Sequence, residues 1–216
     1  MKMIIFLILS GYLISFSGCS EDTVTNSGTS VNTISGKIEN WQFGSKRLKV
    51  LAYSYVHTQS AVIDTGFIDG SGNFSFKCMM PPDSEFALID LTDSGCYNTV
   101  TVNPPDAKYS VIGFLVCDSM GTTLGDIFRC SDSVNLEHEG QTQATYIIID
   151  RPCTVTGLDS CNINGNVRLN VLDLNYSKGW NSFFLTYTDY HPPDFIRTVQ
   201  TSFQPQQVKW YFNWIY

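Results

Sequence analysis

Residues 61–78 read AVIDTGFIDGSGNFSFKC and decide the fold class of this 216-residue chain. Apolar and polar residues alternate on both sides of the turn DGSGN at residues 69–73. The glycines of this turn can adopt positive φ, and Asp69 and Asn73 can hydrogen-bond to their own backbone. The pattern predicts a β-hairpin with strands over residues 61–68 and 74–78. A calcium loop is the alternative, although the spacing of an EF-hand and its final Glu are missing.

Further short runs of β-favouring residues lie on both sides of this hairpin, separated by Gly, Pro and Asn. A hairpin is expected within residues 172–187, and the last two strands are expected to pair with each other. No segment repeats its apolar residues at helical spacing, so the chain is predicted to be all-β. The expected strands cover residues 34–38, 48–55, 86–91, 109–117, 124–130, 144–149, 167–176, 180–187, 197–203 and 207–216.

These strands predict an antiparallel β-sandwich of about ten or more strands over residues 34–216. Two packed β subdomains are the alternative, with a division near residue 92 or 151. The composition supports a packed domain, since aromatic residues make up 13% and charged residues only 15% of the chain.

The N-terminus has the pattern of a secretory signal. Lys2 precedes an apolar run over residues 3–16, which is too short to span about 30 Å of hydrocarbon as a helix. Residues 1–18 are therefore expected to be a signal peptide that is removed. The polar residues 19–33 that follow are expected to form a flexible tether.

The run ends in FSGC at residues 16–19, which resembles the lipobox of bacterial lipoproteins, with Phe16 where Leu is usual. The resemblance implies cleavage after Gly18 and lipid attachment at Cys19. It also implies a lipid anchor in the outer membrane of a bacterial cell envelope, with the domain facing the periplasm or the cell surface. Cleavage without lipid attachment is the alternative.

Six cysteines remain when Cys19 is set aside. An even number in an oxidising compartment favours three disulfides, whose connectivity the sequence leaves open, and buried free thiols are the alternative. No two of them have the two- to four-residue gap of a typical zinc site, so no metal site is expected. The disulfide candidates are Cys78, Cys96, Cys117, Cys130, Cys153 and Cys161.

Residues 34–91 resemble the transthyretin-like, carboxypeptidase-regulatory-like β-sandwich repeat. The resemblance rests on Gly36 in the first strand, the turn and strand DGSGNFSF at residues 69–76, and the break MMPP before residues 86–89. It implies a non-catalytic accessory or presentation domain. Residues 173–181 together with the strand around Trp210 also resemble the closing half of uncharacterised bacterial lipoproteins, which brings no activity with it.

Residues that could carry chemistry are scattered. His57, His138 and His191 lie far apart, and His138 lies between two Glu in a polar segment that is either a solvated loop or a weak metal site. No serine nucleophile elbow is present. No catalytic residue and no cofactor are therefore expected. The 20 acidic residues leave an envelope hydrolase with paired carboxylates as the alternative function.

The last strand carries large apolar residues at every second position: Trp210, Phe212, Trp214 and Tyr216. They form either a binding platform for glycans or a strand that closes the core. The 20 acidic residues against 13 Lys and Arg argue against a nucleic-acid partner. The expected function is that of a membrane-anchored envelope lipoprotein presenting a non-catalytic β-sandwich for protein or glycan binding or a structural role.

Overall fold

The computed structural model describes residues 33–53, 60–89, 96–133, 137–163 and 166–214, and its all-β architecture confirms the predicted fold class. The described residues form fifteen strands, which join into one mixed sheet. A short 3₁₀ turn at Asp83–Glu85 is the one helical element of the described residues, and none of these residues forms a helix able to cross a membrane. The predicted signal peptide, Cys19, His57 and Tyr216 lie outside the described residues.

The strands are β1 (Thr33–Lys37), β2 (Lys46–Tyr53), β3 (Ser60–Ile68), β4 (Asn73–Lys77), β5 (Ala87–Leu88), β6 (Cys96–Asn98), β7 (Thr101–Asn103), β8 (Lys108–Cys117), β9 (Thr123–Cys130), β10 (Thr142–Ile149), β11 (Cys153–Ile163), β12 (Asn166–Tyr176), β13 (Gly179–His191), β14 (Phe195–Thr201) and β15 (Lys209–Trp214).

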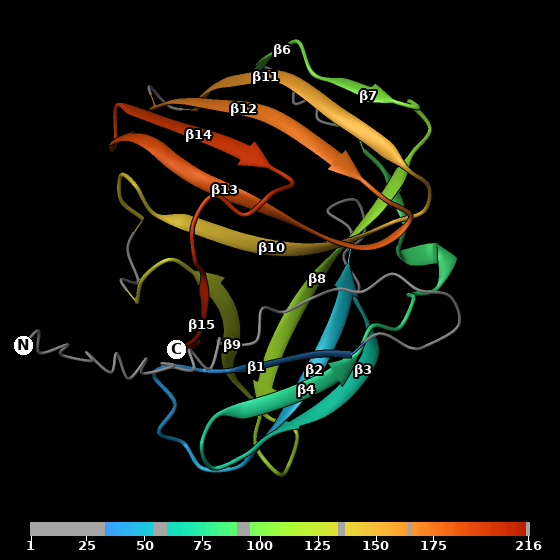
Figure 1. Ribbon diagram of the computed structural model, residues 1–216, viewed down its shortest axis with the longest axis vertical. Coiled ribbons are helices and arrows are strands. Elements are labelled where there is room, and N and C mark those ends of the chain that lie inside the picture. The colour runs from blue at the N-terminus through green and yellow to red at the C-terminus, as the bar shows by residue number, and fades with distance from the viewer. Residues whose placement is uncertain (1–32, 54–59, 90–95, 134–136, 164–165, 215–216) are drawn as a thin grey trace, which may run out of the picture.

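The sheet folds into two halves that share β8 (Figure 1). Strands β1 to β4 lie in the lower half with β9 and β15, and strands β10 to β14 lie in the upper half with β6 and β7. The order of strands is β1-β4-β3-β2-β8-β9-β10-β13-β14-β12-β11-β6. Strand β8 pairs with β10 over residues 109–112 and with β9 over residues 115–117, so it passes from one half to the other.

The halves have separate hydrophobic cores, and β8 and β10 form the wall between them. Because side chains alternate across a strand, Ile112 and Ile148 enter the lower core while Val111 and Ile147 enter the upper core. This explains why β10 contains the continuous buried run YIII at residues 146–149. Neither residue 92 nor residue 151 separates the cores, since the lower core contains both Ile34 and Phe212.

The predicted hairpin at residues 61–78 is confirmed as β3 and β4. The Asp69 carboxylate accepts hydrogen bonds from the backbone N–H groups of Ser71 and Asn73 at 2.8 and 2.9 Å, and from the Asn73 amide at 2.9 Å. The bonds to Asn73 lower the pKa of Asp69. The Asp69 carboxylate is therefore hydrogen-bonded within its own turn, as predicted for Asp and Asn at these positions.

The predicted hairpin within residues 172–187 is wrong. Strand β14 lies between β12 and β13 and runs parallel to β12, which also makes the sheet mixed rather than wholly antiparallel. Trp180, at the start of β13, packs near Phe76 in the lower core and donates from Nε1 to the Met79 carbonyl at 3.1 Å. Leu172 and Leu174 pack in the upper core, so β12 and β13 diverge.

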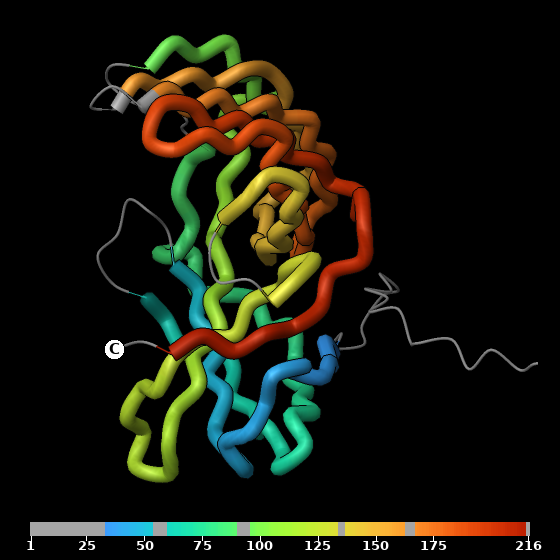
Figure 2. Tube along the Cα trace, turned by 90° about the vertical axis from the view of Figure 1, so that its left-hand side faces the viewer, coloured from blue at the N-terminus to red at the C-terminus, as the bar shows by residue number. Residues whose placement is uncertain are grey.

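The expected pairing of the last two strands is also wrong. Strand β14 stays in the upper sheet, whereas β15 pairs with β9 in the lower half. Figure 2 shows the segment between β14 and β15 descending along one side of the molecule. Trp210 and Phe212 of β15 pack in the lower core. The Asn40 amide donates to the Phe212 carbonyl at 3.0 Å and its oxygen accepts from the Phe212 N–H at 2.9 Å.

Strand β11 was not expected from the sequence, although it is eleven residues long and lies next to β12. Its sequence, CTVTGLDSCNI, has few large apolar residues and reads as a loop. Backbone hydrogen bonds on both sides hold β11 as a strand, since it pairs with β12 on one side and with β6 and β7 on the other.

Candidate functional site

An apolar groove of about 450 Å³ lies among the strands of the upper half. Strands β8, β10, β11, β12, β13 and β14 supply its walls, with one residue from the segment after β5. Every described lining residue is uncharged. The lining consists of Ile89, Tyr109, Val111, Gln143, Thr145, Ile147, Ile149, Val155, Leu172, Leu174, Tyr176, Phe183, Leu185 and Gln200.

Strand alternation places these side chains. Gln143, Thr145, Ile147 and Ile149 are every second residue of β10 and therefore point to one face. Six residue steps separate Gln143 from Ile149, which makes the groove about 20 Å long in the strand direction. Its two ends differ in character.

The end at Ile149 is apolar and mostly buried, although Ile89 and Tyr109 there are partly exposed. Ile149 is paired with Tyr109, and Tyr176 lies across from them at the end of β12. Ile149 is 0% and Tyr176 5% exposed, and burial raises the pKa of the Tyr176 hydroxyl above its usual value. A ligand part placed here would be removed from water.

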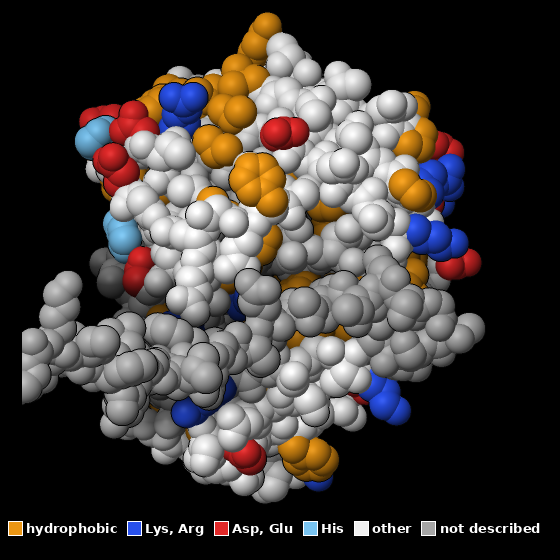
Figure 3. All heavy atoms as spheres, viewed as in Figure 1, with side chains coloured by type: hydrophobic (Ala, Val, Ile, Leu, Met, Phe, Trp, Pro, Cys, Tyr) orange, Lys and Arg blue, Asp and Glu red, His pale blue; other side chains and the backbone are white. Residues whose placement is uncertain are grey.

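The open end carries two amides. Gln143, Leu185 and Gln200 are register partners on β10, β13 and β14, so the two Gln side chains flank Leu185. Both are partly exposed, and Gln143 donates to the Gln141 side chain at 3.2 Å. In the space-filling view, hydrophobic side chains emerge on this half of the molecule, and most charged ones lie near the margins (Figure 3).

A row of polar side chains continues beyond the open end. The Thr198 hydroxyl donates to the Asn170 amide oxygen at 2.7 Å, and the Asn170 amide donates to the Asp159 carboxylate at 3.0 Å. Tyr187 is the register partner of Thr198. Burial and a hydrogen bond with the Glu137 carboxylate raise the pKa of Tyr187.

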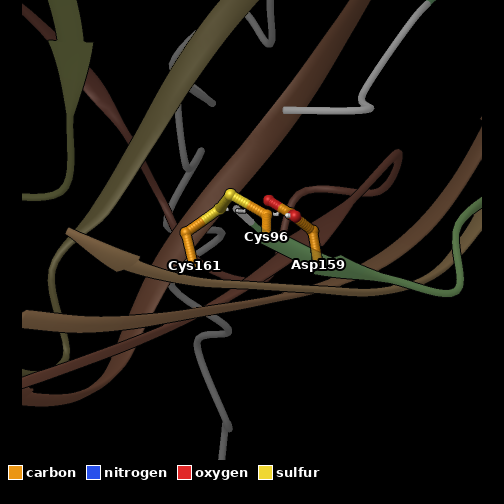
Figure 4. Close-up of side chains that lie close together, drawn as sticks. All are labelled: Cys96, Asp159 and Cys161. Atoms are coloured by element: carbon orange, nitrogen blue, oxygen red, sulfur yellow. Dashed lines mark hydrogen bonds between the residues drawn. A yellow bond between two sulfur atoms is a disulfide. The ribbon is translucent and has the colours of Figure 1, made fainter. Parts of the chain in front are cut away.

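One disulfide, Cys96–Cys161, ties β6 to β11 beside this row (Figure 4). The two cysteines are direct register partners with Cα atoms 4.3 Å apart. The Asp159 carboxylate lies 3.7 Å from the Cys161 sulfur. The disulfide joins the outermost described strand of the upper half to the sheet.

The other two predicted disulfides are not formed. Cys78, Cys117, Cys130 and Cys153 have free thiols. Cys117 is paired with Thr123 at one end of β9 and Cys130 closes the other end, about 23 Å away along the strand, so these two cannot be bridged. Cys153 lies in the upper core, whereas Cys78 packs against the lower one. Cys117, Cys130 and Cys153 are therefore buried free thiols, as in the alternative, and Cys78 is a partly buried one.

The predicted aromatic platform is for the most part a core strand. Trp210 and Phe212 are 3% and 4% exposed and pack in the lower core, so a glycan could not stack on them. Trp214 is 39% exposed and contacts Phe43 and Phe212, with ring centroids 4.9 and 5.2 Å apart. Tyr216 lies outside the described residues.

A second cavity of about 400 Å³ lies where β8 changes partner. Arg129, which is 8% exposed, donates to the Tyr146 hydroxyl at 2.9 Å and lies over the rings of Tyr146 and Trp210. Asp126 lines the same cavity, and burial raises the pKa of its carboxyl. Asp126 is the one carboxylate among the described lining residues, so this cavity does not bring two acids together.

Glu139, Asp189 and His191 are the described residues best placed to hold a metal ion outside the disulfide. Their ligand atoms lie within 4.8 Å of one another, at an exposed edge of β13. His191 Nε2 lies 3.0 Å from the Asp189 carboxylate. His138, the weak metal candidate of the sequence, pairs instead with Asp132 at 3.2 Å.

The chain has no significant match among protein-family models, curated proteins or solved structures. The groove must therefore be interpreted from its own residues. Sequence reasoning placed Ile147, Ile149, Leu172 and Leu174 in strands but did not bring them together, since β14 inserts between β12 and β13. The signal in the sequence that could have located one wall of the groove is the set of every second residue of β10, from Gln143 to Ile149.

Proposed function

We propose that this protein is a membrane-anchored envelope lipoprotein whose non-catalytic β domain is a binding module, and that the groove of the upper half is its binding site. The observation that carries the proposal is an uncharged groove of about 450 Å³, along which the β10 residues pass from partly exposed at Gln143 to fully buried at Ile149. Pockets that enclose small molecules have volumes of about 300–1,000 Å³ and mostly apolar walls.

The groove favours a small apolar ligand over the protein or glycan partner expected from the sequence. Ile147, Ile149 and Val155 are at most 4% exposed, so a flat protein surface could not reach them. Each methylene group buried from water contributes about 0.8 kcal/mol. Sugar rings bind to exposed aromatic faces, but Trp210 and Phe212 are buried.

The lipid anchor is the second part of the proposal. It rests on the FSGC sequence at residues 16–19 and on the polar residues that follow it. An acyl chain at Cys19 would keep the groove close to a source of apolar ligands. The hydrolase alternative finds no support in the groove, because its described lining contains no carboxylate.

Native mass spectrometry of the full chain, extracted from membranes in a non-ionic detergent, tests the binding module. We expect a bound small molecule as added mass on the wild-type protein. Thr145→Trp and Leu185→Trp fill the groove and should lose this mass, whereas Thr156→Trp, on the exposed face of β11, should keep it. Thermal unfolding establishes that each variant is folded.

An unliganded wild-type protein would contradict the proposal. So would retention of the same added mass by both folded groove-filling variants.

A further inference from the structure

We propose that the groove selects a single-chain amphiphile with a neutral, hydroxyl-bearing head group, and that it holds the chain toward Tyr176 and the head at Gln143 and Gln200. This inference rests on the proposed function and specifies its ligand. It follows from the order of the side chains along the groove.

Burial determines where the acyl chain of the ligand lies. Along β10 the lining passes from partly exposed at Thr145 to fully buried at Ile149, and the buried side chains of Val111, Val155 and Leu174 lie beside it. Only an apolar segment can be transferred there without losing hydrogen bonds to water. The groove has a volume of about 450 Å³ and a length of about 20 Å along β10, which suits a single acyl chain.

The side-chain amides of Gln143 and Gln200 determine where the head group of the ligand lies. Gln143 and Gln200 each offer a donor and an acceptor, and both are partly exposed at the open end. Tyr187 and Thr198 in the next row are buried and already hydrogen-bonded to Glu137 and Asn170, so the two amides are the polar groups offered to a head group. Hydroxyl groups on a ligand can both donate to and accept from such partners, whereas a carboxylate can only accept.

The charges around the head end disfavour an anion. Asp159 and Glu137 place two carboxylates beyond the amides, and the exposed Arg168 is the cation that acts on Tyr187 from this side. The described lining itself has no cation to pair with a fatty acid carboxylate. Bringing such a carboxylate to the amides would remove water from it without supplying a counter-ion.

Photolabelling with two probes tests the selectivity. The probes are palmitic acid and monopalmitoyl glycerol, each with a diazirine at the same carbon, added to the full chain in phosphatidylcholine nanodiscs. Labelling of groove peptides is divided by the amount of membrane-bound probe. We expect the glycerol ester to label residues 143–149 and 172–185 at least about tenfold more than the acid does at pH 7.

A charge introduced at the head end should reverse this preference. Gln200→Lys should lower the ester-to-acid ratio about tenfold, because it supplies the missing cation. Gln42→Lys makes the same change at an exposed position of the lower half and should leave the ratio unchanged. Labelling by the acid should also rise as the pH falls and its carboxyl becomes neutral.

Equal labelling by both probes in the wild-type protein would overturn the head-group assignment, as would a ratio that Gln200→Lys leaves unchanged. Labelling of groove peptides by neither probe would instead contradict the proposed function. The two failures are therefore distinguishable.

Discussion

At the scale of single residues, burial decides between the two interpretations of the C-terminal aromatic residues. Trp210 contacts Phe74, Phe114 and Tyr146, with ring centroids 5.0, 5.3 and 5.9 Å apart. The alternation of aromatic residues in this strand was visible in the sequence. Whether these residues face the core depends on the pairing of β15 with β9, and the sequence did not predict this pairing.

Trp210→Ala should lower the free energy of unfolding by about 3–5 kcal/mol, because it leaves a large cavity among packed rings. Urea unfolding measures the change. Trp214→Ala is the matched control at a position that is 39% exposed, and a clearly smaller loss is expected there. Equal losses at the two positions would contradict the assignment of Trp210 to the core.

Asp126 predicts a pH dependence of stability. Burial raises the pKa of its carboxyl above the ordinary 3.8, so ionisation is more costly in the folded state than in the unfolded one. The penalty is absent below pH 3.8, grows as the pH rises through the folded-state pKa, and is constant above it. Asp126→Asn should therefore be more stable than the wild-type protein at pH 7.

Urea unfolding at pH 7 and at pH 3.5 measures this difference, which should vanish at the lower pH. Asp173→Asn, at an exposed position of β12, is the control. The same gain at both pH values for Asp126→Asn would show that ionisation is not its cause.

At the scale of elements, strand pairing explains which cysteines can meet. The even cysteine count predicted three bridges, but a disulfide requires Cα atoms less than about 7 Å apart. Only Cys96 and Cys161, facing each other on β6 and β11, are bridged among the described residues. Because β6 and β11 were both missed as strands, the sequence could not single out this pair.

Alkylation before and after reduction, with peptide mass mapping of the denatured protein, checks the assignment. We expect Cys78, Cys117, Cys130 and Cys153 to be alkylated without reduction. Cys96 and Cys161 should be alkylated only after reduction. Protection of any of the four free thiols before reduction would restore a further disulfide of the sequence prediction.

At the scale of the whole molecule, the sequence predicted the class of fold and most strands but not how they assemble. Alternation and turn residues are local signals, and they located the β3–β4 hairpin correctly. The groove depends on pairings between distant segments, such as β10 with β13 and β12 with β14. Local composition does not encode these pairings, so a polar strand such as β11 is recognised only from its neighbours.

The two cores differ in composition, which suggests different roles for the two halves. The lower core is rich in aromatic rings, while the upper core surrounds a cavity lined by apolar and uncharged polar residues. The lower half would serve as a rigid base and the upper half as the binding part. The lipid anchor and the transthyretin-like resemblance of residues 34–91 stay predictions.

The decisive measurement is a crystal structure of the protein with monopalmitoyl glycerol. We expect continuous ligand density between β10, β12 and β13, with the acyl chain toward Tyr176 and the glycerol within hydrogen-bond distance of Gln143 or Gln200. A groove filled by its own side chains, or ligand density only outside the groove, would show that the groove is not the binding site.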